Sequence, residues 1–310
     1  MSKKTNQNNI NKTTEKSLCT SCGICKSVCP VDAVEMKYIS GQYLPQIKED
    51  KCINCELCLK ICPGYQVDYT RLYSYKNEKY PENIFVGNHE KCYTAYTKDD
   101  MIRKKSTSGG LITEIIIQLL KNKKYKKAFV VRSDPAESGE ARLEAVSTEK
   151  EVLESAKSKY IPVSVENVIE YIKNNPEDKI VVVGTSCHFH GIYKFLMEEK
   201  REDDNILFLG LFCDRTLNYN LINYFEDYHL ATGDRLKSFD YRSKEDKGWP
   251  GNLKISSQSN KEKFIDRKIR IWLKPYFTLN RCHFCIDKLN QFADISFGDC
   301  YIKGEESYLG

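Results

Sequence analysis

The chain has 310 residues, of which 41% are hydrophobic, enough for two domains or for one large domain and a smaller module. Its formal net charge of +5 is small and both signs are mixed along the sequence, so no nucleic-acid partner is expected. No apolar run is long enough to cross a bilayer, which predicts no transmembrane segment. Residues 1–16 are polar and lack the apolar core of a signal peptide. These features predict a soluble, cytoplasmic protein with a disordered tail over 1–16.

The 14 cysteines point to metal or redox use, because a reducing cytoplasm disfavours disulfides. Residues 19–30 read CTSCGICKSVCP and residues 52–63 read CINCELCLKICP. Both are the C-x2-C-x2-C-x3-C-P run of the bacterial two-cluster ferredoxin, in which the fourth cysteine of each run binds the other 4Fe-4S cluster. The repeat predicts a ferredoxin domain over 17–68, with one cluster on Cys19, Cys22, Cys25 and Cys62, and the other on Cys52, Cys55, Cys58 and Cys29. A zinc or disulfide module is the alternative, and two complete copies with their prolines in register disfavour it.

Residues 69–90 are polar and rich in Tyr and Lys, as expected of a connector. Next, KKSTSGG (104–110) precedes LITEIIIQLLKNKKY, whose apolar residues recur at helical spacing. Two glycines that open a helix leave backbone N–H groups free and let an anion approach closely. An ordinary helix cap with a tight turn is the equally common alternative.

A βαβ unit is predicted further along the chain. Strands are expected at 128–133 and 142–148, around the turn 134–140, followed by a helix to about Lys157 and another over 165–175. KIVVVG (179–184) then reads as a buried strand, TSC as a tight loop, HFHGIYKFLMEEK as a helix and NILFLGLFC (205–213) as a second buried strand. Strand, helix and strand at this spacing predict two parallel neighbouring strands whose carboxyl ends share one edge of the sheet.

That edge is predicted to carry a third cluster. Cys187 follows the first strand of the unit and Cys213 ends the second, so both can meet the C-x2-C pair Cys282 and Cys285. Two alternatives stay open: the first two cysteines are core residues, or the site holds zinc with His188 or His283. The remaining thiols, Cys92 and Cys300, are expected to be buried or inert.

The C-terminal part reads as a mixed or antiparallel region with strands at 236–242, 252–258 and 268–273. Asp294 and Asp299 are expected either to face the site or to cap turns, and His188 and His190 to be structural. No catalytic acid or base stands out, and hydride transfer needs none.

With these residues in hand, the chain resembles the coenzyme F420 hydrogenase/dehydrogenase beta subunit family, in the form with an N-terminal two-cluster ferredoxin. The resemblance rests on KSTSGG (105–110), SKY (158–160), VGTSCH (183–188), Cys213, KGW (247–249) and the C-x2-C pair followed by ADISFGD. It implies a 4Fe-4S cluster on Cys187, Cys213, Cys282 and Cys285. It also implies an FAD site on Ser106, Thr107, Ser108, Gly109, Gly110, Lys159, Tyr160, Gly184 and Thr185.

The predicted fold is α+β/α/β: a small ferredoxin module followed by a mixed-sheet α/β flavoprotein domain that contains the βαβ unit. After the tail and the ferredoxin domain come a connector (69–90), an FAD-binding part (91–165) and a C-terminal part (166–310) with the third cluster. Family members continue past the end of this chain, so its last sheet is expected to be short or truncated.

The resemblance implies an FAD- and iron-sulfur-dependent oxidoreductase, with coenzyme F420 or another small redox substrate on one side and ferredoxin or a redox partner subunit on the other. A deazaflavin gives a hydride and a cluster carries one electron, so a flavin is expected between them. Two alternatives remain. The first is that the chain is a ferredoxin-dependent reductase of another substrate, for example in polysaccharide biosynthesis. The second is that it is a non-enzymatic electron-transfer subunit.

Overall fold

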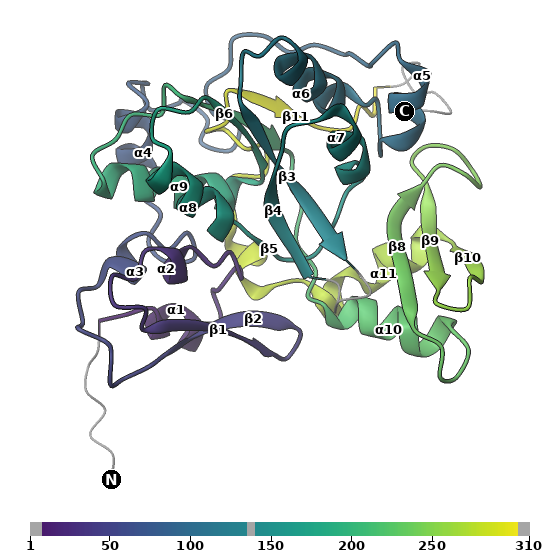
Figure 1. Ribbon diagram of the computed structural model, residues 1–310, viewed down its shortest axis with the longest axis horizontal. Coiled ribbons are helices and arrows are strands. Elements are labelled where there is room, and N and C mark those ends of the chain that lie inside the picture. The colour runs from purple at the N-terminus through teal and green to yellow at the C-terminus, as the bar shows by residue number, and fades with distance from the viewer. Residues whose placement is uncertain (1–7, 135–139, 303–310) are drawn as a thin grey trace.

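The computed structural model describes residues 8–134 and 140–302, and its centre is a six-stranded sheet in the order β11-β7-β6-β3-β4-β5 (Figure 1). Strands β11, β7, β6 and β3 run parallel, β4 is antiparallel to β3, and β5 is parallel to β4. The strands are β3 (Lys127–Asp134), β4 (Glu140–Val146), β5 (Val163–Ser164), β6 (Ile180–Gly184), β7 (Ile206–Leu211) and β11 (Ile295–Phe297).

Helices cover both faces of this sheet, because its strands are apolar on both sides. Phe129 and Val182 face one layer, which contains α8 (Glu166–Asn174) and α9 (Ser186–Glu198). Val130 and Val181 face the other, which contains α5 (Asp100–Lys105), α6 (Leu111–Lys121) and α7 (Glu149–Ser155). The side chains of successive residues in each strand therefore point to opposite helical layers, as the two-residue period of a strand requires.

The predicted βαβ unit is confirmed. Strands β6 and β7 are parallel neighbours, with Val182 beside Phe208, and α9 connects them. Cys187 lies in the first turn of α9, not in the tight loop predicted for TSC, because Thr185 already caps the helix. The predicted strands at 128–133 and 142–148 and the helix over 165–175 are also found, within a few residues. The centre of the predicted turn, 135–139, lies outside the described residues.

A second sheet lies beside the first, in the order β10-β9-β8, and all its pairs are antiparallel. Its strands are β8 (Leu236–Ser243), β9 (Asn252–Ser257) and β10 (Glu262–Ile265), and α10 (Asn220–His229) and α11 (Arg267–Phe277) pack near it (Figure 1).

The strand predicted at 268–273 is wrong, because these residues belong to α11. The alternation of Ile269, Ile271 and Leu273 favours a strand, whereas Ile269, Leu273 and Phe277 share one face of a helix. In the structure the segment follows the helical pattern. Leu273 is buried with Ile269 and Phe277 packed beside it, and Ile271 is half exposed. The side chain of Asp266 accepts a hydrogen bond from the N–H of Lys268 and so caps the helix.

The N-terminal module contains α1 (Asn11–Glu15), α2 (Ile24–Ser27), the hairpin of β1 (Val34–Ile39) and β2 (Gln42–Ile47), and α3 (Leu57–Lys60). One sequence prediction needs correction here. The described part of the tail is ordered, since Ile10 is buried and α1 follows it. The predicted connector begins with a helix, α4 (Tyr69–Tyr75), whose Leu72 and Tyr73 are buried in the main core.

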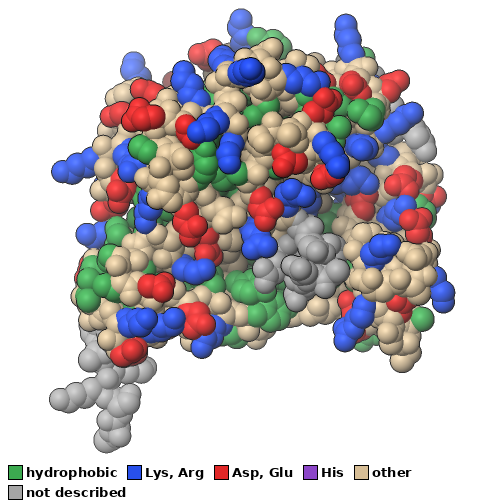
Figure 2. Space-filling model, viewed as in Figure 1, with side chains coloured by type: hydrophobic (Ala, Val, Ile, Leu, Met, Phe, Trp, Pro, Cys, Tyr) green, Lys and Arg blue, Asp and Glu red, His purple; other side chains and the backbone are tan. Residues whose placement is uncertain are grey.

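The module shares a hydrophobic core with the large domain. Ile24, Val28 and Ile61 belong to the same buried cluster as the residues of α8 and α9. The N–H of Val165 donates to the carbonyl of Cys22, and Lys26 pairs with Glu166. Figure 1 shows the module directly below α8 and α9. On the face shown in Figure 2, basic and acidic side chains are interspersed, as the mixed charge of the sequence suggests.

Candidate metal centres and cofactor site

The eight cysteines of the repeat come together in the two sets that the motif predicts. Burial raises the pKa of Cys25, and the nearby sulfurs of Cys22, Cys19 and Cys62 raise it further. Burial, with smaller contributions from Cys55, Cys29 and Cys52, raises the pKa of Cys58 to about 11. Each set therefore contains three cysteines of one run and the fourth of the other, the crossed arrangement of a two-cluster ferredoxin.

The backbone turns in the same way in both copies of the repeat. Ser21 and Asn54 occupy the same position of the two runs, and both have a positive φ; so do Gly23 and Glu56. Turns of this kind point successive N–H groups into a concavity that suits an anion. The N–H of Ser21 lies 3.4 Å from the sulfur of Cys19 and that of Ala33 lies 3.2 Å from Cys29, which are donors that a cluster-bound thiolate requires.

Four further cysteines meet at the carboxyl edge of the parallel sheet. Burial, with smaller contributions from Cys282 and Cys285, raises the pKa of Cys187 to about 12. Burial also raises the pKa of Cys213, whose next largest influence is Cys187. Cys282 lies in the short 3-10 helix η2 (Asn280–Phe284), Cys285 follows it, and the N–H of Thr216 donates to the sulfur of Cys282 at 3.3 Å. The structure thus brings the four predicted residues together.

The other two cysteines stand apart from these groups. Cys92 is exposed, and Cys300 is half-buried. Within the described ranges, no three His, Cys, Asp or Glu side chains converge closely enough to hold a single metal ion. A 4Fe-4S cube is a larger body than one ion.

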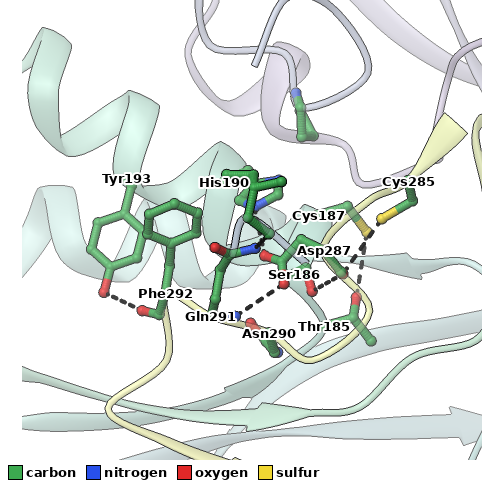
Figure 3. A network of polar contacts seen from close by, with 12 residues as sticks. Thr185, Ser186, Cys187, His190, Tyr193, Cys285, Asp287, Asn290, Gln291 and Phe292 are labelled. Atoms are coloured by element: carbon green, nitrogen blue, oxygen red, sulfur yellow. Dashed lines mark hydrogen bonds and ion pairs between the residues drawn. The ribbon is translucent and has the colours of Figure 1, made fainter. Parts of the chain in front are cut away.

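A buried polar network, not foreseen from the sequence, fixes the loop that carries Cys285 (Figure 3). The carboxylate of Asp287 accepts hydrogen bonds from Nε2 of His190 and the N–H of Gln291, both at 3.0 Å. Its backbone carbonyl accepts a bond from Ser186 at 2.7 Å. The side chains of His190 and Asp287 are 1% and 0% exposed. His190 is therefore structural, as expected, but its partner has no sequence signature.

The other predicted polar residues also have structural partners. Burial lowers the pKa of His188 to about 4, so its ring is neutral at pH 7 and Nδ1 accepts the N–H of Thr185. Asp294 accepts the N–H of Phe208, and Asp299 pairs with Arg242 at 2.6 Å.

Helix α9 links the third cysteine group to the ferredoxin module. Cys187, in its first turn, is close enough to Cys22 for that thiol to raise its pKa. One turn further, Gly191 faces the module, and a Cβ added there would lie 2.3 Å from Cδ1 of Ile24 and 3.4 Å from Cδ of Pro63. The absence of a side chain at Gly191 lets the module approach this helix.

Replacing Gly191 by valine should therefore push the module away from α9. Ile24 is fully buried, so its side chain has little room to move, and such overpacking costs about 1–3 kcal/mol. We expect a lower melting temperature and slower electron transfer between the third cysteine group and the module, with the iron content unchanged. Glu199→Val, at the exposed end of the same helix, is the control. Unchanged stability and transfer in Gly191→Val would show that this contact is not needed.

The residues predicted to hold FAD lie in two places. Ser106 to Gly110 form the turn between α5 and α6, and Thr107 accepts the N–H of Ser158 at 2.8 Å. This contact joins the turn to Lys159 and Tyr160. Lys159 points inward: its amine donates to the carbonyl of Ala156, and burial lowers its pKa to about 8.

The other two residues predicted to contact FAD, Gly184 and Thr185, lie at the edge of the sheet next to Cys187. Thr185 caps α9, and the carbonyl of Gly184 accepts the amide of Asn290 at 2.9 Å. The requirement for glycine at 184, 109 and 110 has local causes. A Cβ at Gly184 would lie 2.7 Å from the ring of Phe189, one at Gly109 would lie 3.0 Å from Cβ of Tyr96, and Gly110 has φ +78°.

Two surface hollows lie elsewhere on the described part of the chain, and neither is lined by a residue predicted to hold FAD. The larger, about 540 Å³, lies between α5 and α7, and the smaller, about 270 Å³, lies between α8 and the start of β7.

Comparison with known proteins places the chain in a family. Residues 18–67 match a 4Fe-4S dicluster domain, which makes this an iron-sulfur protein. Residues 92–170 match the N-terminal part, and residues 177–309 the C-terminal part, of the coenzyme F420 hydrogenase/dehydrogenase beta subunit. The chain belongs to the coenzyme F420 hydrogenase/dehydrogenase beta subunit family, as its motifs predicted.

Three curated proteins are similar over much of the chain. A coenzyme F420-dependent sulfite reductase from Methanocaldococcus jannaschii is 24% identical over 93% of this chain and 43% of its own length. The coenzyme F420 hydrogenase subunit beta of Methanosarcina barkeri is 22% identical over 70% of this chain and 72% of its own. One component of the F420H2 dehydrogenase of Methanosarcina mazei is 23% identical over 91% of this chain and 75% of its own. This chain thus spans less than half of the sulfite reductase.

The fold has a counterpart among solved structures. A chain of the F420-reducing [NiFe] hydrogenase complex from Methanosarcina barkeri aligns with a TM-score of 0.51 at 20% identity, over 70% of this chain and 72% of that one. Among the described residues, no helix is both long and apolar enough to cross a membrane.

Proposed function

We propose that this chain is an iron-sulfur flavoprotein oxidoreductase. It passes electrons between a hydride carrier, FAD and 4Fe-4S clusters, to or from a redox partner, and coenzyme F420 is the favoured carrier. The observation that carries the proposal is the continuity of the three cysteine groups. Cys187 of the third group neighbours Cys22 of one ferredoxin group, and Cys25 of that group neighbours Cys58 of the next.

This continuity gives the order in which the three cysteine groups follow one another along the proposed electron path. The third group lies at the edge of the large sheet, and the group with Cys22 lies between it and the group with Cys58. In that outermost group Cys55 is exposed, and the neighbouring Ile53 is 60% exposed. Electrons would therefore leave or enter through the group of Cys52, Cys55, Cys58 and Cys29, where a partner can approach.

The donor sets suit iron-sulfur clusters. Each group offers four free thiols, mostly withdrawn from solvent, and backbone N–H groups point at sulfurs in all three. Hydrogen bonds to sulfur and the degree of burial are the means by which a protein sets a cluster's potential. The chain's part is to hold the thiols at fixed positions and to shield them from water.

The turn 106–110 and the segment 158–160 are the proposed FAD contacts, supported by the hydrogen bonds between Thr107 and Ser158. A bound flavin supplies the exchange between two-electron and one-electron transfer. Gly184 and Thr185 remain proposed contacts from the other side of the sheet edge.

The choice of coenzyme F420 rests on the names of the relatives, all of which refer to this coenzyme.

Anaerobic purification of the full chain with extraction of its cofactors, followed by a test of reduced F420 as donor, decides between the candidate functions. We expect FAD, iron and oxidation of the reduced deazaflavin. Flavin and iron without any reaction of F420 would favour a ferredoxin-dependent reductase of another substrate. Full iron without flavin would favour a non-enzymatic electron-transfer subunit.

Replacing Gly109 by valine tests the turn itself. The added side chain must displace Tyr96 or the carbonyl of Ala95, which would lie 3.3 Å from a Cβ at this position, and the turn must shift with them. We expect the flavin content to fall while the iron content stays close to that of the parent, because no cysteine ligand is near. Lys124→Val, which changes an exposed residue just beyond the far end of α6, is the control. Full flavin occupancy in Gly109→Val would exclude this turn from the site.

A further inference from the structure

Three buried basic side chains gather next to the turn 106–110, in a part of the chain to which neither the motifs nor the proposed function gives a role. Arg242 lies near the end of β8, Lys244 directly follows that strand, and Arg270 lies on α11. Each of the three residues is only 7% exposed. The two arginines come from different elements and flank Tyr160: the guanidinium of Arg270 lies 4.8 Å from the centre of its ring, and Nη1 of Arg242 lies 3.4 Å from its hydroxyl.

The two guanidinium groups are incompletely paired. Arg242 donates from Nη1 to Asp299 and from Nε to the carbonyl of Pro250, but its Nη2 has no partner among the described residues. The Nε of Arg270 has none there either. Buried donors without acceptors are costly, and buried like charges more so. Burial lowers the pKa of Arg270, and the nearby charge of Arg242 lowers it further.

The carboxylates around the two guanidinium groups do not balance the charge of both. Asp299 is the carboxylate paired with Arg242, and the nearby Asp240 pairs with Lys157. In the part of the chain that the structure describes, no carboxylate forms an ion pair with Arg270. The two arginines therefore carry an excess of positive charge in a buried place, which an anionic ligand would neutralise.

The cluster is joined directly to the turn proposed to contact FAD. The amine of Lys244 donates to the carbonyl of Ser108 at 2.7 Å and to that of Arg103 at 2.8 Å. Tyr160 belongs to the segment that follows Ser158, the partner of Thr107. The two arginines thus belong to a buried cluster that contacts the turn through Lys244 and the segment 158–160 through Tyr160.

We propose that Arg242 and Arg270 form a phosphate-binding site, which holds the phosphate or phosphodiester group of a nucleotide-type cofactor or hydride carrier. Guanidinium groups suit this ligand, because their planar fork donates two parallel hydrogen bonds to phosphate oxygens. The inference rests on the proposed function only for the identity of the molecule that carries the phosphate. The excess of buried donors points to the anion independently.

The test uses the full chain, freed of bound small molecules, and inorganic pyrophosphate as the probe. Pyrophosphate should raise the melting temperature of the parent protein. In Arg270→Met this shift should be lost and affinity measured by calorimetry should fall about tenfold or more, while the melting temperature without ligand stays the same or rises. Arg270→Lys, which keeps the charge but loses the fork, should fall between the two. The control is Arg267→Met, which changes an exposed arginine on the same helix.

A purely structural arginine gives the opposite pattern. Arg270→Met would then lower the melting temperature without ligand and leave the response to pyrophosphate intact, which would overturn the proposal. The absence of any response in the parent protein would overturn it as well.

The source of the phosphate is decided by comparing ligands with and without it. If the site serves FAD, Arg270→Met should weaken FAD binding more than riboflavin binding. If it serves the deazaflavin carrier, the variant should weaken F420 binding more than binding of its phosphate-free deazaflavin nucleoside. Should the chain bind no flavin and not react with F420, the proposed function fails, but a response to pyrophosphate that depends on Arg270 would still establish the anion site.

Discussion

Cys213→Ala is expected to lose about four of the roughly twelve iron atoms that three 4Fe-4S clusters bring to each chain. Cys213 lies just beyond β7, next to Cys187, Cys282 and Cys285, so its removal leaves the third group with three thiols. The backbone N–H of Cys213 donates to the carbonyl of Lys288, and alanine keeps that bond. The loss should therefore be one of ligation and not of folding.

The two ferredoxin clusters should survive this change, since their eight cysteines lie in residues 19–62. Iron analysis and electron paramagnetic resonance of the reduced protein would separate the outcomes. Reduced F420 should no longer reduce the ferredoxin clusters in the variant, whereas dithionite still should.

Cys92→Ala and Cys300→Ala are the matched controls, because neither thiol lies among the four-cysteine groups. Cys92 is exposed, and Cys300 directly follows Asp299, the residue that pairs with Arg242. A loss of iron in Cys300→Ala, with none in Cys213→Ala, would mean that the wrong thiol has been assigned to the third group.

The ligand groups could be predicted from the sequence because their spacing is local or follows from a simple topology. The ferredoxin repeat fixes eight cysteines by spacing alone. The meeting of Cys187 and Cys213 follows from the βαβ unit, since parallel strands end at the same edge. That these groups hold clusters stays a proposal, but the geometry that the proposal needs was foreseeable.

What the sequence could not show depends on long-range packing. The helical spacing of Ile269, Leu273 and Phe277 competes with a strand-like alternation, and only the core that receives Leu273 decides between them. The pairing of His190 with Asp287 and the excess charge around Arg270 join residues far apart in the chain, and no local motif marks them. The same is true of Gly191, whose role depends on a module more than a hundred residues away.

The network around Asp287 has the largest predicted effect on stability. Asp287→Ala removes the acceptor of both His190 and Gln291, and the His190 ring then has neither nitrogen paired with a described residue, because its Nδ1 already has no such partner. Each buried donor left without its acceptor costs about 1–3 kcal/mol, so the loss of both bonds costs about 2–6 kcal/mol. We expect the free energy of unfolding to fall by about that amount and the third group to lose iron, since this carboxylate holds the loop that carries Cys285.

Two further variants separate the charge from the shape of this side chain. Asp287→Asn keeps the volume and one acceptor, and a neutral His190 can change tautomer to accept from the amide, so we expect a smaller loss of about 1–2 kcal/mol. Asp227→Ala, which changes an exposed carboxylate near the end of α10, should change little. Denaturant unfolding with iron analysis checks the series. If Asp287→Ala unfolds like the parent and keeps its iron, then the third group is positioned by η2 and the end of β7 alone, and the buried pair has no part in holding it.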